Sequence, residues 1–157
     1  MVCRDIPEEF SEYFKTGNGI YHYRNMANPD VHFNFNIQRL VQNYRAGFLQ
    51  LVINSINGNS EKKQEAISIL SAMEEYFPSN QLPYNNDKLE LQVAQLNHLL
   101  GDETEYRNRL KIIENREINN VETLLSVGQM YLSELNDYEK AFQIFNKLYL
   151  NQPNNVE

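Results

Sequence analysis

The sequence predicts an all-α protein made of short helical hairpins, and three observations support this expectation. From residue 37 onward apolar residues recur at three- and four-residue steps, which is the period of an amphipathic helix. The chain of 157 residues contains six glycines and five prolines, too few for the many turns of an all-β domain. Its 22 asparagines outnumber every other residue type, and many of them lie where the apolar period breaks.

Length and composition narrow the class of protein further. A chain of 157 residues, 41% hydrophobic and 22% charged, is typical of one globular domain that buries a core without disulfides or metals. Cys3 is the only cysteine, which excludes an intrachain disulfide. A net charge of −7 argues against a nucleic-acid partner. The longest apolar runs are only a few residues long, so we expect no direct membrane insertion by this segment.

The first 36 residues differ in pattern from the rest and predict an irregular arm packed on a helical domain that spans residues 37–157. Residues 9–15 can form one short helix, which Gly17-Asn18-Gly19 would end. Asn28-Pro29-Asp30 is a turn signal, because proline restricts its predecessor to extended conformations. We expect the aromatic residues of the arm to hold it against the helices.

The first two helices are predicted from an apolar stripe and its interruptions. The stripe runs through residues 37–56 and ends at Asn57-Gly58-Asn59, where a left-handed cap can form. A second helix is expected over residues 61–77, and Pro78 stops it. The apolar positions of the two helices are Ile37, Leu40, Val41, Tyr44, Phe48, Leu51, Val52 and Ile56, then Ala66, Ile67, Leu70, Met73 and Phe77.

Four further helices follow in two pairs. The spacings of Asp87 to Glu90 and of Asp102 to Glu105 are those of capping boxes, in which each side chain binds an orphan backbone amide. These boxes begin the third and fourth helices, which Gly101 separates. We expect the third helix over residues 87–100, the fourth from 102 through 113, the fifth around 124–131 and the sixth from about 138 to 150.

The hairpins are similar to one another, which indicates an internal repeat. On the second helix of each pair, apolar residues follow a starting residue at four and seven positions. Two of the three sets begin with alanine, which lets two helices cross closely, and end with proline. The equivalent sets are Ala66, Leu70, Met73 and Pro78; Tyr106, Leu110, Ile113 and Ile118; and Ala141, Phe145, Leu148 and Pro153.

These spacings resemble the tetratricopeptide repeat. The last unit matches best, through Leu124, Gly128 and Tyr131 on its first helix and Pro153-Asn154-Asn155 at its end. The middle unit departs from the family by having Asn97 in place of an aromatic residue. The resemblance implies a right-handed α-α superhelix of about three helical hairpins, preceded by the irregular arm.

A second resemblance covers residues 20–78. The runs at residues 23–31 and 37–45, together with Met73-Glu74-Glu75 before Pro78, are similar to the soluble C-terminal region of a family of large bacterial membrane proteins. The N-terminal halves of that family resemble protein O-mannosyltransferases. The resemblance implies that this chain is a non-catalytic tail of a membrane-bound parent, displayed outside the cytoplasm.

The tetratricopeptide resemblance also implies where a partner would bind. The first helix of each hairpin lines the concave face of such a stack, where peptides commonly bind and where glutamine can bond a peptide backbone. On this sequence the resemblance points to Lys88, Gln95, His98, Glu122, Gln129 and Ser133. We therefore expect a protein or peptide partner, or the remainder of the parent chain itself.

Charged residues in and beside the arm allow two interpretations. Arg24, Asp30, Arg39 and Arg45 would anchor the arm to the first helix, the arginines binding Asp30 or backbone carbonyls. In the alternative interpretation, the arginines recognise an anionic or carbonyl group of a ligand. Both interpretations place Arg39 and Arg45 on a helix that is otherwise rich in apolar and amide side chains.

The leading hypothesis is a non-catalytic protein-interaction or scaffolding module that needs no cofactor and no metal. The sequence has neither a phosphate-binding glycine loop nor a nucleophile elbow. The alternative is a small-ligand, metal-binding or enzymatic domain built on the arm's arginines and histidines, although the spacing of His22 and His32 matches no recognised metal motif. A third hypothesis is a structural appendage that orients a membrane transferase.

Overall fold

The computed structural model describes residues 25–56, 60–116 and 120–151, and within these ranges all regular structure is helical. This confirms the predicted all-α class. The predicted short helix at residues 9–15 lies outside the described residues. The helices are α2 (Phe35–Ile56), α3 (Ser60–Tyr76), α4 (Asp87–Leu100), α5 (Glu103–Asn115), α6 (Val121–Ser133) and α7 (Tyr138–Asn151).

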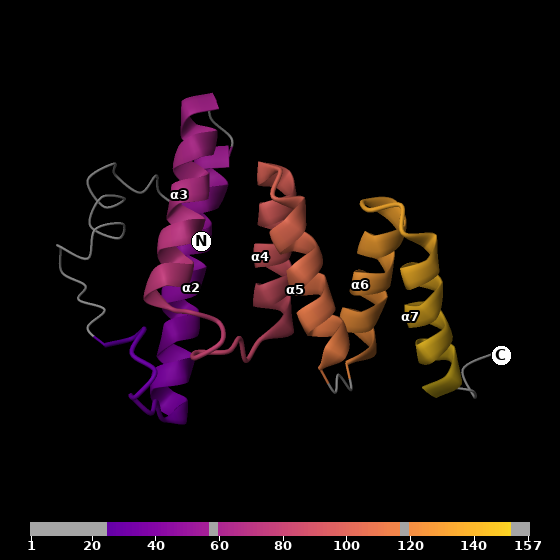
Figure 1. Ribbon diagram of the computed structural model, residues 1–157, viewed down its shortest axis with the longest axis horizontal. Coiled ribbons are helices and arrows are strands. Elements are labelled where there is room, and N and C mark those ends of the chain that lie inside the picture. Colours follow the sequence, from indigo (N-terminus) through magenta and orange to yellow (C-terminus); the bar gives the residue numbers. More distant parts are fainter. Residues whose placement is uncertain (1–24, 57–59, 117–119, 152–157) are drawn as a thin grey trace, which may run out of the picture.

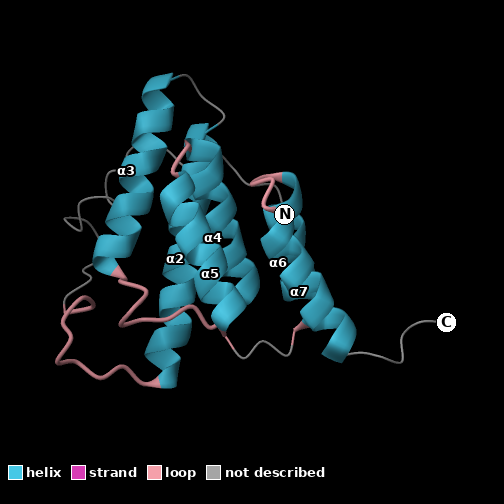
Figure 2. Cartoon of the chain, turned by 45° about the vertical axis from the view of Figure 1, so that its right-hand side comes forward, coloured by secondary structure: helices cyan, strands magenta, loops and turns pink. Residues whose placement is uncertain are grey.

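The helices form three hairpins that stand in a row (Figure 1). Within the hairpins α2 packs on α3, α4 on α5 and α6 on α7 (Figure 2). Neighbouring hairpins meet through smaller contacts, in which α4 touches both α2 and α3, and α6 touches α5. Within the described ranges, no helix combines the length and the apolar character needed to cross a membrane.

The helix α4 belongs to two hydrophobic cores at once. Val93, Leu96 and Leu100 pack with α2, α3 and the loop after α3 in a first core. Leu91 and Ala94, on the other side of α4, pack with α5, α6 and α7 in a second core. Burying both sides of α4 therefore holds the hairpins together, since its apolar surface is removed from water only when both neighbours are in place.

Local caps explain where several helices begin. Asn34 Oδ1 accepts a hydrogen bond from the backbone amide of Ile37 (3.0 Å), so α2 begins two residues before the predicted start. Asp102 Oδ1 accepts from the amide of Glu105 (3.0 Å), which confirms the predicted cap of the fourth helix. Gly101 ends α4 with a left-handed φ of 90°, as the sequence predicts.

The predicted capping box of Asp87 and Glu90 is wrong, because the preceding residue caps α4. Asn86 Oδ1 accepts hydrogen bonds from the amides of Lys88 (3.0 Å) and Leu89 (3.4 Å). Asp87 instead pairs with Arg116 (3.4 Å), and the buried Glu90 pairs with the same guanidinium (2.5 Å). Burial raises the pKa of Glu90, and the charge of Arg116 opposes that rise. Both acids thereby tie α4 to the end of α5.

The described end of the predicted arm, residues 25–34, lies against the first hairpin. Met26 and Phe33 pack against the first core. The side-chain amide of Gln81 donates to the carbonyl of Asn28, and that of Gln38 donates to the carbonyl of Phe33 (3.1 Å). Apolar burial and two glutamine side chains therefore hold this part of the chain in place.

The helices α6 and α7 approach most closely at Gly128. A Cβ atom added at Gly128 would lie 2.6 Å from Cε1 of Phe145, which is far below an ordinary contact. Phe145 itself packs against the second core. The ring of Phe145 therefore occupies the space that a side chain at residue 128 would need.

Replacing Gly128 with leucine should lower the free energy of unfolding by about 2 kcal/mol, because the new side chain must displace the ring of Phe145 from a packed core. Gln129→Leu, at the neighbouring exposed position, should change it by less than about 0.5 kcal/mol. Urea denaturation followed by circular dichroism measures both values. Equal destabilisation by the two variants would contradict the role given to Gly128.

Candidate functional site

Three of the six residues predicted to bind a partner lie together between α4 and α6. Lys88, Gln95 and Glu122 line a pocket of about 230 Å³. The ammonium of Lys88 lies 3.3 Å from a carboxylate oxygen of Glu122, so an exposed ion pair bridges the two helices. The other lining residues are Leu91, Gln92, Thr123, Ser126 and Met130.

The other three predicted residues lie outside this pocket. His98 is half-buried, and its ring lies 4.8 Å from the ring of Tyr106 on α5, between centroids. Gln129 and Ser133 are exposed on α6, where the Ser133 hydroxyl donates to the Gln129 carbonyl (2.7 Å). The structure therefore brings Lys88, Gln95 and Glu122 together around one pocket and places the other three predicted residues outside it.

A second pocket, of about 590 Å³, shares one lining residue with the first. Lys88 lines both, and Arg39, one of the arginines singled out in the sequence, lies in the second. The lining residues come from α2, from the start of α4 and from the cap of α6: Phe35, Arg39, Gln42, Asn43, Asn85, Asn86, Asp87, Lys88 and Asn120. We call the two pockets together the polar groove.

Exposed amides give the polar groove its chemistry. Asn43 and Asn85 from the second pocket, and Gln92 and Gln95 from the first, are all exposed. Each side-chain amide offers two donors and an acceptor, which match the C=O and N–H groups of an extended peptide. Sequence reasoning missed Asn43, Asn85 and Gln92, although the excess of asparagine and the position of Gln92 three residues before Gln95 could have indicated them.

The residues expected to anchor the arm have different positions. Arg24 lies outside the described residues, Asp30 is exposed, and Arg39 is exposed in the polar groove. Arg45 is fully buried. One of its terminal nitrogens donates to the carbonyls of Phe77 (2.7 Å) and Leu82 (2.6 Å). Arg45 was expected to hold the arm, but these carbonyls belong to the segment that joins α3 to α4.

Arg45 begins a partly buried charge network, which we define as Arg45, Glu74, Tyr84, Glu105 and Arg109. The guanidinium of Arg45 lies 3.9 Å from the centre of the Tyr84 ring. The Tyr84 hydroxyl donates to Glu74 (2.9 Å), and Glu74 pairs with Arg109 on α5 (2.7 Å). Arg109 also pairs with Glu105 (2.9 Å). The network therefore runs from α2 through the α3–α4 loop to α5.

Burial and neighbouring charges act against each other on the two arginines. Burial lowers the pKa of Arg45, although Tyr84 and Glu74 oppose the effect. Burial also disfavours the charge of Arg109, but Glu74, Tyr84 and Glu105 outweigh it and raise the pKa of Arg109 overall. Arg109 is thus better compensated by acids, whereas Arg45 depends on carbonyls and on the aromatic ring.

The network forms one end of a cleft of about 580 Å³ between α3, α4 and α5. Its lining mixes apolar residues such as Leu70 and Val93 with four charged ones, which are Glu74, Asp102, Glu105 and Arg109. Among the described residues, neither a histidine nor a cysteine lines this cleft. The cleft was not predicted from the sequence, because its sides come from three helices whose contacts only the fold creates.

The alternative metal site has no counterpart in the described part of the chain. No group of three or more His, Cys, Asp or Glu residues there could hold a metal ion. His32 is exposed and does not line the pocket around Arg39, and His22 lies outside the described residues.

Replacing Arg45 with methionine should lower the free energy of unfolding by about 3 kcal/mol, because two buried carbonyls lose their donor. Arg39→Met, an exposed change on the same helix, should stay within about 0.5 kcal/mol of the parent protein. Urea denaturation compares the two variants. A loss of stability no greater for Arg45→Met than for Arg39→Met would refute the anchoring role of Arg45.

Buried tyrosines should make the protein sensitive to alkali. Burial, aided by the carboxylate of Glu114, raises the pKa of Tyr131 to about 12, and burial also raises the pKa of Tyr84 and Tyr106. The pKa of each of these tyrosines is higher in the folded state than its usual value of 10.0. The stability that the protonated tyrosines contribute is therefore complete below pH 10.0 and is lost as pH rises through the folded-state pKa.

The variant Tyr131→Phe should therefore release about one proton fewer on unfolding between pH 10 and pH 12. The slope of unfolding free energy against pH, measured by urea denaturation across this range, gives that number. Indistinguishable slopes for Tyr131→Phe and the parent protein would count against the shift.

Comparisons with protein-family models, with curated proteins and with solved structures each found no match for this chain. The resemblance to tetratricopeptide repeats and the resemblance to the tails of membrane transferases therefore stay predictions from the residues quoted above. A function for the chain depends on the geometry of its polar groove and its cleft.

Proposed function

We propose that the chain is a non-catalytic protein-interaction module whose polar groove binds an extended peptide segment of a partner. The observation that carries this proposal is the lining of the groove. It takes residues from the first helix, or the cap of the first helix, of all three hairpins. Exposed amides recur along it, and they suit a peptide backbone better than they suit catalysis.

Contacts between the hairpins support a tetratricopeptide-like superhelix as part of the proposal. The helix α4 packs against both helices of the preceding hairpin, and α6 packs against the second helix of its own predecessor. The starting residues of the three repeated sets, Ala66, Tyr106 and Ala141, are all buried, at 0–1% exposure. In such a stack the first helices share one face, which agrees with the lining of the polar groove.

The resemblance over residues 20–78 extends the proposal to a parent protein. In this proposal the module is the soluble tail of a membrane-bound, glycosyltransferase-like protein, and its partner is another protein or another part of that parent. The enzymatic alternative is less well supported, because Arg39 lies among amides in the groove without His32 nearby in the lining.

The groove proposal can be tested with peptides selected on the immobilised protein from a random display library. The double variant with Asn43→Ala and Gln95→Ala should bind them about tenfold or more weakly, because each change removes hydrogen bonds to the peptide backbone. Isothermal titration calorimetry measures the affinities. Chemical-shift changes on peptide addition should gather at groove residues.

Two exposed glutamines outside the groove provide matched controls. Gln64→Ala on α3 and Gln129→Ala on α6 remove similar side chains that line neither pocket. Both should leave the affinity unchanged. Peptides whose affinity falls with the control variants, or persists in the groove double variant, would show that the groove is not the binding surface.

A further inference from the structure

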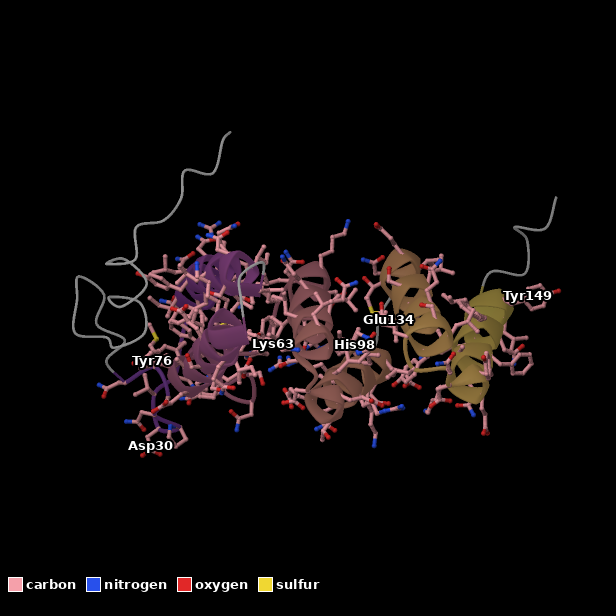
Figure 3. The ribbon with its side chains drawn as sticks, turned by 90° about the horizontal axis from the view of Figure 1, so that it is seen from above. Asp30, Lys63, Tyr76, His98, Glu134 and Tyr149 are labelled. Carbon is pink, nitrogen blue, oxygen red and sulfur yellow. The ribbon has the colours of Figure 1, made fainter. Side chains whose placement is uncertain are left out.

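The last helix of the row carries an aromatic stripe that the described elements leave largely exposed. Tyr138, Phe142 and Tyr149 on α7 are 66%, 69% and 60% exposed, and Phe145 between them is half-buried. Figure 1 shows α7 at the end of the row, and Figure 3 shows Tyr149 directed away from the other helices. We call Tyr138, Phe142, Phe145 and Tyr149 the aromatic stripe.

In the two earlier hairpins, the positions equivalent to the aromatic stripe contact the next hairpin. Ala66 and Ala141 are equivalent and lie 75 residues apart, so Ile67, Leu70 and Glu74 of α3 correspond to Phe142, Phe145 and Tyr149 of α7. On α3 these three residues line the cleft shared with α4 and α5 of the next hairpin. On α5, the residue equivalent to Phe142 is Arg107, which pairs with Asp137 of the next hairpin (3.7 Å). The aromatic stripe therefore occupies a surface that elsewhere in the chain meets another hairpin.

We propose that a second copy of this chain covers the aromatic stripe, in a symmetric dimer with the two α7 helices antiparallel. The stripe is palindromic about a point between residues 143 and 144. Tyr138 and Tyr149 are equally far from that point, and so are Phe142 and Phe145. An antiparallel pair therefore sets Tyr138 against Tyr149 of the second copy and Phe142 against Phe145 of the second copy. Such reciprocal matching is what a two-fold symmetric interface requires.

The apolar area is large enough for this role. A buried aromatic side chain covers roughly 150–250 Å², so three that are about two-thirds exposed offer roughly 350 Å². Leu150, which is 66% exposed and follows Tyr149 on α7, and the edge of Phe145 bring each copy to roughly 500 Å². The two copies together would bury about 1,000 Å², the size at which specific interfaces begin. The stripe itself carries no charge, so pairing two copies buries no charged group from it.

Sedimentation equilibrium of the full chain tests the proposal. We expect a concentration-dependent mass that rises from the monomer value of 18.5 kDa towards twice that value. The double variant with Phe142→Ser and Tyr149→Ser should weaken association at least tenfold while keeping its helical circular dichroism. Leu99→Ser, which removes an apolar side chain that is 59% exposed on α4, should dimerise like the parent chain.

A pair of charge substitutions tests the antiparallel orientation. Tyr138→Glu alone and Tyr149→Lys alone should each weaken the dimer. Both changes in one chain should restore it, because Glu at 138 then faces Lys at 149 of the second copy at both ends of the interface.

Two outcomes would overturn the proposal. A parent chain that stays monomeric at high micromolar concentration would exclude a second copy as the occupant of the stripe. A double charge variant that stays as weak as either single variant would exclude antiparallel α7 pairing. Neither outcome bears on peptide binding, because no residue of α7 lines the polar groove.

Discussion

A single buried guanidinium fixes how the first hairpin joins the second. Arg45 lies on α2 and holds the carbonyls of Phe77 and Leu82, which stand at the end of α3 and in the loop that leads to α4. A buried guanidinium must find its acceptors inside the protein, and the two carbonyls likewise need a donor. Moving the loop would leave both unsatisfied. The network then continues through Tyr84 and Glu74 to Arg109, so the start of α4 and the position of α5 depend on the same set of interactions.

Because α4 packs on both sides, its anchoring also positions the rest of the molecule. One face contributes Val93 and Leu100 to the first core and to the cleft, and the opposite face contributes Leu91 to the second core and Gln95 to the polar groove. The groove and the cleft therefore lie on opposite sides of one helix, and both take their shape from where that helix is anchored. Two of the four exposed amides, Gln92 and Gln95, lie on α4, so the anchoring of this helix sets where their side chains can meet a partner.

The polar groove and the aromatic stripe have different chemistry and share no residues. Amides in the groove offer directional hydrogen bonds, which select a partner but supply little free energy each, since water competes for the same groups. The stripe offers apolar area, which drives association without direction. A dimer formed through α7 would present two grooves, so a partner with two binding segments would gain avidity from the second site without any new contact within either groove.

The sequence by itself determined the helical class, the six helices described within residues 35–151 and most of their ends. These features depend on interactions within a few residues, such as the period of apolar side chains, the cap at Asp102 and the left-handed turn at Gly101. The tertiary structure decided which residues far apart in the sequence contact each other. Arg45 reaches carbonyls 32 and 37 residues away, His98 lies tilted against the ring of Tyr106, and Arg116 draws Asp87 and Glu90 away from capping α4. A buried or ionic side chain takes the partner that folding brings nearest, and the identity of that partner is set by packing and desolvation rather than by neighbouring sequence.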